Sequence, residues 1–118
     1  MRHRPPRIVL PEGPVLAARH HRAALLDAEG EIALHDPRGI RAALAGGAVP
    51  IVCHAPATAR RLGLGPFPAA DLLELFAFAR PAEPVVPSPA GLADALGLAR
   101  PRGLEAEVGL LREAAIAL

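Results

Sequence analysis

The segment from residue 71 to residue 98 constrains the fold of this chain most, because start and stop signals for two helices follow one another in it. It reads DLLELFAFARPAEPVVPSPAGLADALGL. Asp71 opens an apolar helix that ends before Pro81, since proline cannot continue a helix. Ser88 then caps a short second helix, which Gly97 closes. The segment carries almost no polar chemistry, so we interpret it as a packing element.

The first of these two helices, about Ala70–Ala79, is apolar nearly all round. Only Asp71 and Glu74 interrupt it before Arg80. A helix of this kind is usually buried on several sides. We therefore expect a buried helix, with Asp71 as its N-cap and not as a metal ligand.

The first third of the chain reads as strands. Short apolar runs predict strands at Arg7–Leu10, Val15–Ala18 and Ala23–Asp27. Glu29-Gly30 supplies a turn, after which Glu31–Leu34 can return as a hairpin partner.

A helix, a strand and a further short helix are predicted next. Asp36 is the N-cap of the first helix and a proline occupies its first position. The apolar run Val49–Cys53 predicts a buried strand, and Ala57–Leu62 predicts the second helix. Together with a strand at Ile32–Leu34, this order favours a βαβ crossover.

The last segment, Arg102–Leu118, has apolar residues at helical spacing and no stop signal. We therefore expect one accessory domain over residues 1–118, truncated at its C-terminus. Its parts are a strand and hairpin part at 1–35, a helix-strand-helix part at 36–63 and a helical part at 69–118. The predicted class is α/β or α+β, with N-terminal strands and a hairpin, one central strand and three to five helices.

Composition excludes several kinds of site. The single cysteine, Cys53, rules out an internal disulfide and a self-contained cysteine-ligated zinc or iron–sulfur site. Without lysine there is no ordinary P-loop, and three phenylalanines without tyrosine or tryptophan leave little to stack on bases. No apolar run approaches the roughly 20 residues of a membrane span, and the N-terminus does not read as a signal peptide. We expect a cytoplasmic protein that makes no membrane contact.

The net charge of +1 is unevenly distributed. Up to Arg61 there are nine arginines against five acidic residues, and from Gly63 onward four arginines against seven. A basic first half favours nucleic acid or an acidic partner, whereas a solvated surface with scattered charge is the alternative, because the arginines form no dense run. The candidates for a DNA contact are Arg19, Arg22, Arg38, Arg41, Arg60 and Arg61.

We expect no catalytic, cofactor-binding or metal-binding residue in this chain, but one alternative site stays open. His54 follows the strand 49–53, and in open α/β sheets binding and catalytic sites lie at the carboxyl ends of the strands. Its neighbour is Cys53, so one interpretation is a cysteine nucleophile with a histidine base. The competing interpretation is a buried cysteine beside a histidine bonded to the backbone. Asp27 and Glu29 fall on one face of a strand. One interpretation is a metal site that consists of Asp27, Glu29, His54 and Asp71, and the other is a hairpin face exposed to solvent.

Part of the second half resembles a known enzyme family. The order VPIVCHA, a short helix, DLLELFAFARP and GLADALGL is similar to the second half of a proofreading-type 3′–5′ exonuclease domain of the ribonuclease H-like fold. That family has a His-Asn pair at the strand end. His54 matches, but Ala55 replaces the asparagine, the next four positions hold no carboxylate and the opening D-x-E-T-T-G strand motif is absent. The resemblance implies a degenerate, exonuclease-like arrangement without two-metal nuclease chemistry.

Residues 71–98 also resemble, more narrowly, the segment ahead of the motor in bacterial ATP-dependent DNA helicases of the DinG type. There D-L-L-E-L-F-A-F-x-x-P-A-x-x-x-V-P-[ST]-P-x-G-L-A-x-A-L-G-L precedes the helicase core, and DAEGEI and AVPIVCHAPATARRLG look similar as well. The resemblance implies an N-terminal non-motor domain, silent by itself, whose partner is its own motor. ATP, Mg²⁺ and in some members an iron–sulfur cluster are implied for that motor, which unwinds DNA 5′ to 3′.

Two alternative functions remain open at this point. In the first alternative, the chain is a small metal-dependent exonuclease-like enzyme. In the second it is a free-standing module that docks an acidic or nucleic-acid partner through its arginine-rich half.

Overall fold

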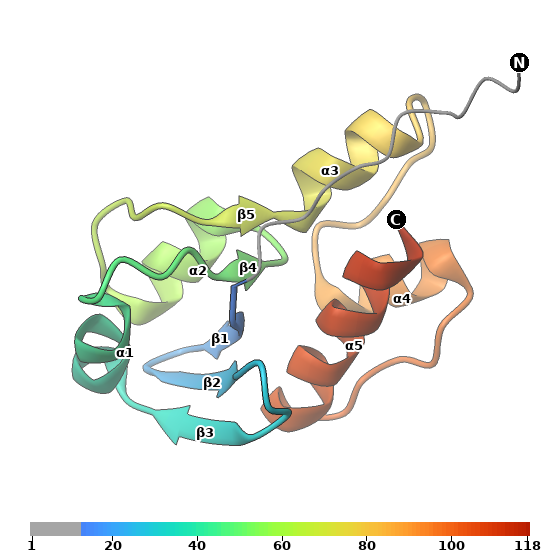
Figure 1. Ribbon diagram of the computed structural model, residues 1–118. Helices are drawn as coiled ribbons and strands as arrows, with labels where there is room; N and C mark the ends of the chain where they lie inside the picture. Colours follow the sequence, from blue (N-terminus) through green and yellow to red (C-terminus); the bar gives the residue numbers. More distant parts are fainter. Residues whose placement is uncertain (1–12) are drawn as a thin grey trace, which may run out of the picture.

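Within residues 13–118, five short strands form one mixed sheet in the order β3-β2-β1-β4-β5 (Figure 1). The first three strands make an antiparallel meander, whereas β4 pairs in parallel with β1 and β5 in parallel with β4. Their bounds are β1 Val15–Arg19, β2 Arg22–Leu26, β3 Ile32–His35, β4 Ile51–Val52 and β5 Ala70–Asp71.

The computed structural model describes residues 13–118. The strand predicted at Arg7–Leu10 lies outside these residues. Within them, the predicted α/β class is confirmed.

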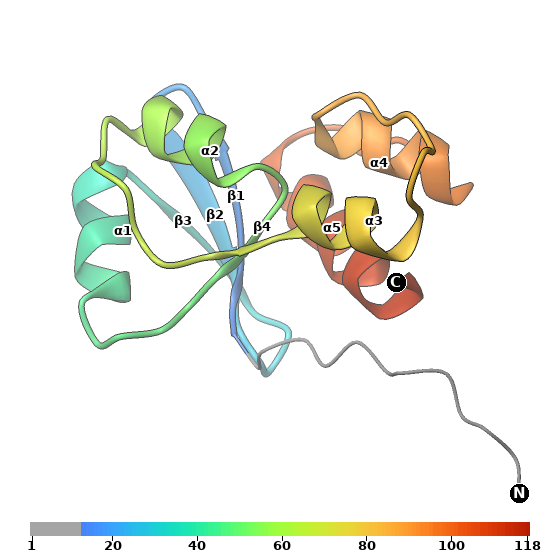
Figure 2. The ribbon, with the colours of Figure 1, turned by 90° about the horizontal axis from the view of Figure 1, so that it is seen from above.

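The helices lie in two layers, one on each side of the sheet. In Figure 2, α1 and α2 lie on one side, and α3, α4 and α5 lie on the other. Their bounds are α1 Pro37–Leu44, α2 Ala55–Leu62, α3 Leu72–Ala79, α4 Pro89–Leu96 and α5 Leu104–Ala117.

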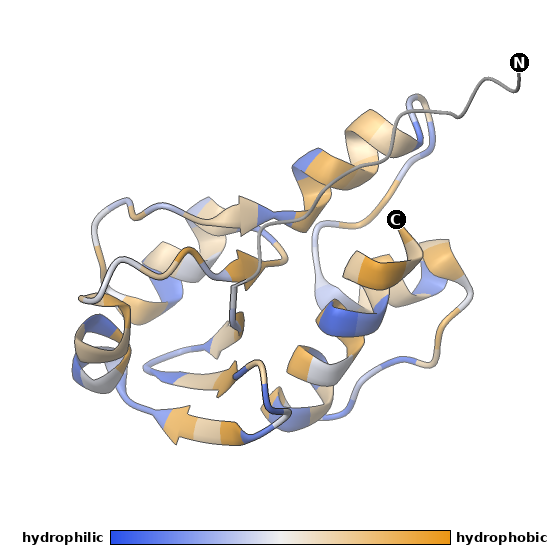
Figure 3. Ribbon diagram, in the orientation of Figure 1, coloured by the Kyte–Doolittle hydropathy of each residue, from blue (hydrophilic) through white to orange (hydrophobic). Residues whose placement is uncertain are grey.

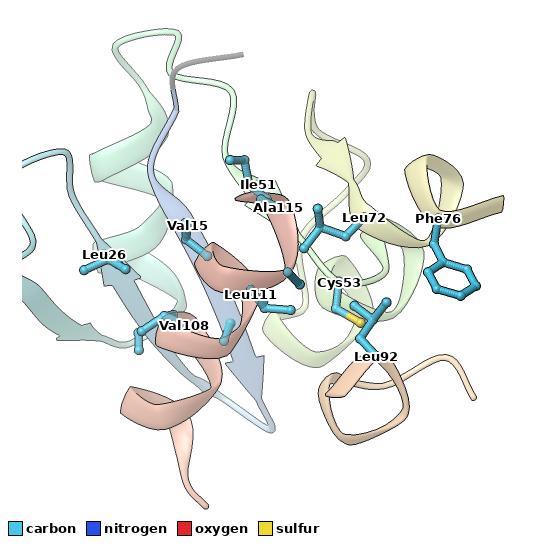
Figure 4. Close-up of a cluster of buried hydrophobic side chains, with 13 residues drawn as sticks. Val15, Leu26, Ile51, Cys53, Leu72, Phe76, Leu92, Val108, Leu111 and Ala115 are labelled. Carbon is cyan, nitrogen blue, oxygen red and sulfur yellow. The ribbon is translucent and has the colours of Figure 1, made fainter. Parts of the chain in front are cut away.

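The alternation of side chains along β1 produces two separate cores. Val15 and Ala17 face α5 and join the larger apolar cluster, which Figure 4 shows in close-up. Leu16 and Ala18 face the opposite way and pack in a smaller cluster with Ile40 of α1 and with residues of α2. Because the central strand is buried on both faces, it carries apolar residues at consecutive positions.

The cap residues predicted from the sequence are confirmed. The Asp36 carboxylate accepts a hydrogen bond from the Gly39 N–H at 2.7 Å, and the Ser88 hydroxyl oxygen accepts one from the Gly91 N–H at 3.0 Å. Gly97 closes α4 at φ 69°, in the left-handed region that favours glycine.

The predicted crossover between β3 and β4 is also present, because both strands run parallel to β1. The chain passes over β2 and β1 through α1 before it enters the sheet again as β4. The run predicted at 49–53 therefore lies beside the central strand β1. The sheet draws strands from all three predicted parts of the chain.

The prediction for the long apolar helix is wrong in two respects. Ala70 and Asp71 pair with β4 as the edge strand β5, so the helix begins at Leu72. Burial on several sides is also wrong: Leu72 and Phe76 are buried, but Phe78 is 76% exposed. The helix projects beyond the sheet and packs on α5. Most of its ribbon has the hydrophobic colours in Figure 3, although only part of the helix is buried.

None of the helices within residues 13–118 has both the length and the apolar character needed to cross a membrane.

Candidate functional site

A surface cleft opens where β1 and β4 end. These two strands run parallel, and the chain leaves them toward opposite edges of the sheet, a position where ligands bind in many α/β proteins. The cleft has a volume of about 420 Å³. Its polar lining comes from β1, α2, α5, the turn after β1 and the N-cap of α4, and consists of Arg19, Arg61, Glu107, His20 and Ser88.

The turn after β1 is tied to α2. His20 and His21 connect β1 to β2 as a two-residue turn, in which His21 adopts φ 57°. The His21 N–H donates a hydrogen bond of 3.0 Å to the carbonyl of Arg61. This bond holds the Arg61 end of α2 beside Arg19, which is the last residue of β1.

The charges in the cleft are two guanidinium groups and one carboxylate. Arg19 donates to Glu107 Oε1 from Nη2 at 2.9 Å and from Nε at 3.3 Å. The Glu107 side chain is 13% exposed and that of Arg19 57%, so the carboxylate forms the inner wall and the guanidinium the rim. Arg61 donates to the Ala18 carbonyl at 3.4 Å. The excess of positive charge suits an anionic ligand better than a metal cation.

The inner recess of the cleft lacks the carboxylates that two-metal chemistry requires. The positions of β1 that reach it are Leu16, Ala17 and Ala18, all buried. Two-metal hydrolysis needs several convergent carboxylates. Within residues 13–118, no three His, Cys, Asp or Glu side chains group so as to hold a metal ion.

His54 lies at this recess but acts as a helix cap. Its Nδ1 accepts a hydrogen bond from the Ala57 N–H at 3.2 Å, at the start of α2. Its carbonyl accepts the Thr58 hydroxyl at 2.8 Å. The interpretation of His54 as a histidine bonded to the backbone is therefore confirmed.

Cys53 is buried in the larger cluster and is not a nucleophile in this environment. Burial, followed by the nearby Asp71 carboxylate, raises the pKa of the Cys53 thiol to about 12. A thiol held in its neutral form neither attacks a substrate nor binds a metal well. A single buried thiol also does not fit an iron–sulfur cluster, which takes several cysteine ligands.

Asp71 connects the start of two helices. Its Oδ1 accepts hydrogen bonds from the N–H groups of Leu73 at 2.9 Å and Glu74 at 3.3 Å, which caps α3. Its Oδ2 accepts the Ala55 N–H at 2.8 Å, at the first turn of α2. The prediction that Asp71 is an N-cap is confirmed, and both oxygens are occupied by backbone groups.

The four residues of the alternative metal site are not brought together. The Asp27 carboxylate accepts hydrogen bonds from the N–H groups of Glu29 and Glu31 at 3.0 and 2.9 Å, which shapes the turn between β2 and β3. Since β2 is antiparallel to β1, this turn lies at the opposite end of the sheet from His54. A five-residue strand spans about 16 Å, so no single ion reaches both ends.

The arginines proposed for DNA fall into separate groups. Arg19 and Arg61 line the cleft, and Arg19 also lines an adjoining hollow with Arg22 and Arg102. Arg60 faces a different, mostly apolar hollow on α2. Arg38 and Arg41 lie on α1, across the sheet from α5.

Glu107 and Ser88 were missed in the sequence as residues of one site. Glu107 pairs with an arginine 88 positions earlier in the chain. No spacing rule connects such distant residues, because the contact exists only once α5 packs across β1.

We compared the chain with protein families, with curated proteins and with solved structures. None of the three comparisons finds a match.

Proposed function

We propose that this chain is a catalytically silent, exonuclease-like accessory domain of a cytoplasmic, DinG-type ATP-dependent DNA helicase. The motif of residues 71–98 supports the helicase part of the proposal. The residues that bind ATP, Mg²⁺ and the iron–sulfur cluster would belong to the motor and not to this chain.

The observation that carries the proposal is the arrangement of the sheet. A meander of three antiparallel strands is followed by two strands parallel to β1, each reached through a helix. This agrees with the ribonuclease H-like fold that the resemblance implies. The His54 position at the end of β4 agrees with it too.

The side chains of the cleft support the absence of nuclease activity. In a ribonuclease H-like nuclease, β1 would provide acidic residues, but here the strand reads VLAAR. Glu107 is the carboxylate of the cleft, and Arg19 neutralises it. Asp71 is occupied by three backbone N–H groups.

A nuclease assay tests the silent state. We expect the 118-residue chain to leave labelled single- and double-stranded DNA intact in Mg²⁺ or Mn²⁺. Turnover that disappears in Glu107→Gln would overturn this part of the proposal.

The reading frame of the gene tests the helicase part. A frame that continues past Leu118 into a Walker A motif is the expected result. A stop codon directly after Leu118, or a downstream region without motor motifs, would refute it and favour a free-standing module.

DNA binding by this domain, if it contributes to the helicase, is proposed at the cleft. Fluorescence anisotropy with a labelled oligonucleotide should give an affinity that falls with salt, because arginine contacts to phosphates release counterions. Arg61→Glu should weaken it strongly, whereas Arg41→Glu on α1 should have a smaller effect. Equal effects of the two variants would contradict a localised contact.

A further inference from the structure

The strand β3 is an open edge of the sheet. It forms the lower border of the sheet in Figure 1, and its outer side pairs with no strand within residues 13–118. Ile32 is 41% exposed and Leu34 50% exposed. Protein sheets usually protect such an edge with a lysine, a proline or a bulge, and the sequence IALH has none of these.

The backbone groups at this edge can be assigned from the pairing with β2. The Asp27 N–H donates to the Glu31 carbonyl at 3.0 Å, so this is a hydrogen-bonded pair of the antiparallel ladder. Hydrogen-bonded and non-hydrogen-bonded pairs alternate along such a ladder. In the register that pairs Leu26 with Ile32, the N–H and C=O groups of Ile32 and Leu34 therefore point outward.

We propose that β3 pairs antiparallel with β3 of a second copy of this chain, about a two-fold axis at Ala33. In this register each Ile32 lies opposite Leu34 of the other copy. The outward N–H and C=O groups of both residues then make four hydrogen bonds across the axis. The two sheets become one continuous sheet.

The side chains are self-complementary in the same register. Ile32 and Leu34 of the two copies form an apolar group on the α5 side, where Leu34 lines a hollow. On the other face, Glu31 lies opposite His35 of the second copy. A shift of the register by one residue would place the outward N–H and C=O groups of one β3 opposite residues of the other β3 whose N–H and C=O groups point toward β2. A shift by two would put Ile32 opposite Asp36 or leave Leu34 opposite Gly30.

The size of the contact sets the expected strength. Stable interfaces bury about 800 Å² on each partner, which is more than one four-residue strand edge offers. We therefore expect a weak dimer, with a dissociation constant of roughly 100 µM. A second copy is favoured over an unrelated strand because hydrogen-bond pattern, apolar pairs and the Glu31–His35 pair agree in one symmetric register.

Disulfide trapping tests the register directly. At the axis, the two Ala33 Cα atoms form a non-hydrogen-bonded pair about 4.5 Å apart, within disulfide range. Two Ile32 Cα atoms would be ~8 Å apart, beyond that range. Ala33→Cys should cross-link within the dimer under mild oxidation, and Ile32→Cys should not. The native Cys53 is buried and does not compete.

Sedimentation equilibrium over 10-fold steps of protein concentration tests whether the exposed side chains of β3 form the dimer interface. We expect Leu34→Lys to weaken self-association at least 10-fold, because it places a charge opposite Ile32. The matched control is Phe78→Lys, which replaces an even more exposed apolar side chain on α3, at 76% against 50% for Leu34, and should leave association unchanged.

Three outcomes would overturn the proposal. These are a monomer at millimolar concentration, a dimer that Phe78→Lys dissociates and Leu34→Lys does not, and cross-linking of Ile32→Cys as fast as Ala33→Cys. The circular dichroism of each variant at low concentration confirms that it folds as a monomer before it is compared.

Discussion

Substitution of Asp71 tests how much the hydrogen bonds at the starts of α2 and α3 contribute to the stability of the fold. Its two oxygens accept three backbone N–H groups, two from the first turn of α3 and one from Ala55 of α2. Removal of an N-cap side chain costs about 1 kcal/mol. A hydrogen bond to a charged group contributes about 1.5–3 kcal/mol. Because the bond to Ala55 is partly buried, Asp71→Ala should lower the free energy of unfolding by about 2–4 kcal/mol.

Two further variants separate the contributions. Serine is a good N-cap but is too short to reach Ala55, so Asp71→Ser should restore about 1 kcal/mol relative to Asp71→Ala. Asp71→Asn keeps one acceptor oxygen and should fall near the serine variant. Urea unfolding followed by circular dichroism at 222 nm measures all three.

Two results for Asp71→Ala would contradict this role of Asp71. A loss below 0.5 kcal/mol in Asp71→Ala would mean that water replaces the carboxylate at both helices. Stabilisation of the wild-type chain by Mg²⁺ or Mn²⁺ that Asp71→Ala abolishes would mean that Asp71 is a metal ligand. In that case the cap would be incidental.

Three other predictions concern the core. Phe76→Ala should cost about 3–5 kcal/mol in urea unfolding because Phe76 is buried, whereas Phe78→Ala on the exposed side of α3 should change stability by less than about 0.5 kcal/mol; equal losses would contradict one-sided packing. Gly91→Ala should destabilise by about 1–3 kcal/mol, since its Cβ would lie 2.0 Å from the Val86 carbonyl oxygen, and Gly109→Ala on α5, where nothing lies within 4 Å, should stabilise by about 0.5–1 kcal/mol. Burial raises the pKa of the Cys53 thiol from 9.0 to about 12, so the native state holds its proton more tightly than the unfolded chain does. The stability this provides is fully present below pH 9 and is lost toward pH 12, by at most about 1.4 kcal/mol per pH unit. The chain has no tyrosine or lysine to titrate there, so Cys53→Ala should remove the slope, and a slope that persists would refute the assignment.

Local signals were sufficient for the helix ends. Asp36, Ser88 and Gly97 each act through groups within four residues, so their roles could be predicted from the sequence. The bonds of Asp71 to Leu73 and Glu74 are local in the same way, whereas its bond to Ala55 joins residues 16 positions apart and was not predictable. The βαβ connection was also predictable, because its helix and strands have separate patterns.

Other features depend on contacts that no local pattern reports. The turn between β1 and β2 contains no glycine, proline or asparagine, and His21 takes its left-handed conformation where Arg61 accepts its N–H. The strand β5 has two residues and runs directly into α3, so its apolar Ala70 was assigned to the helix. The exposed side of α3 follows from its position beyond the sheet and not from its composition.

The alanines of β1 have a consequence for how this domain can change in evolution. Ala17 and Ala18 are 4% and 5% exposed, and α5 and α2 approach the strand over their small side chains. An acidic residue at either position would place a charge in apolar packing, at a cost of several kcal/mol without a partner. Single substitutions therefore lead to unfolding before they lead to metal binding. The exposed Arg19 at the rim can change without this cost, but acidic residues on the strand would require the helices to move first.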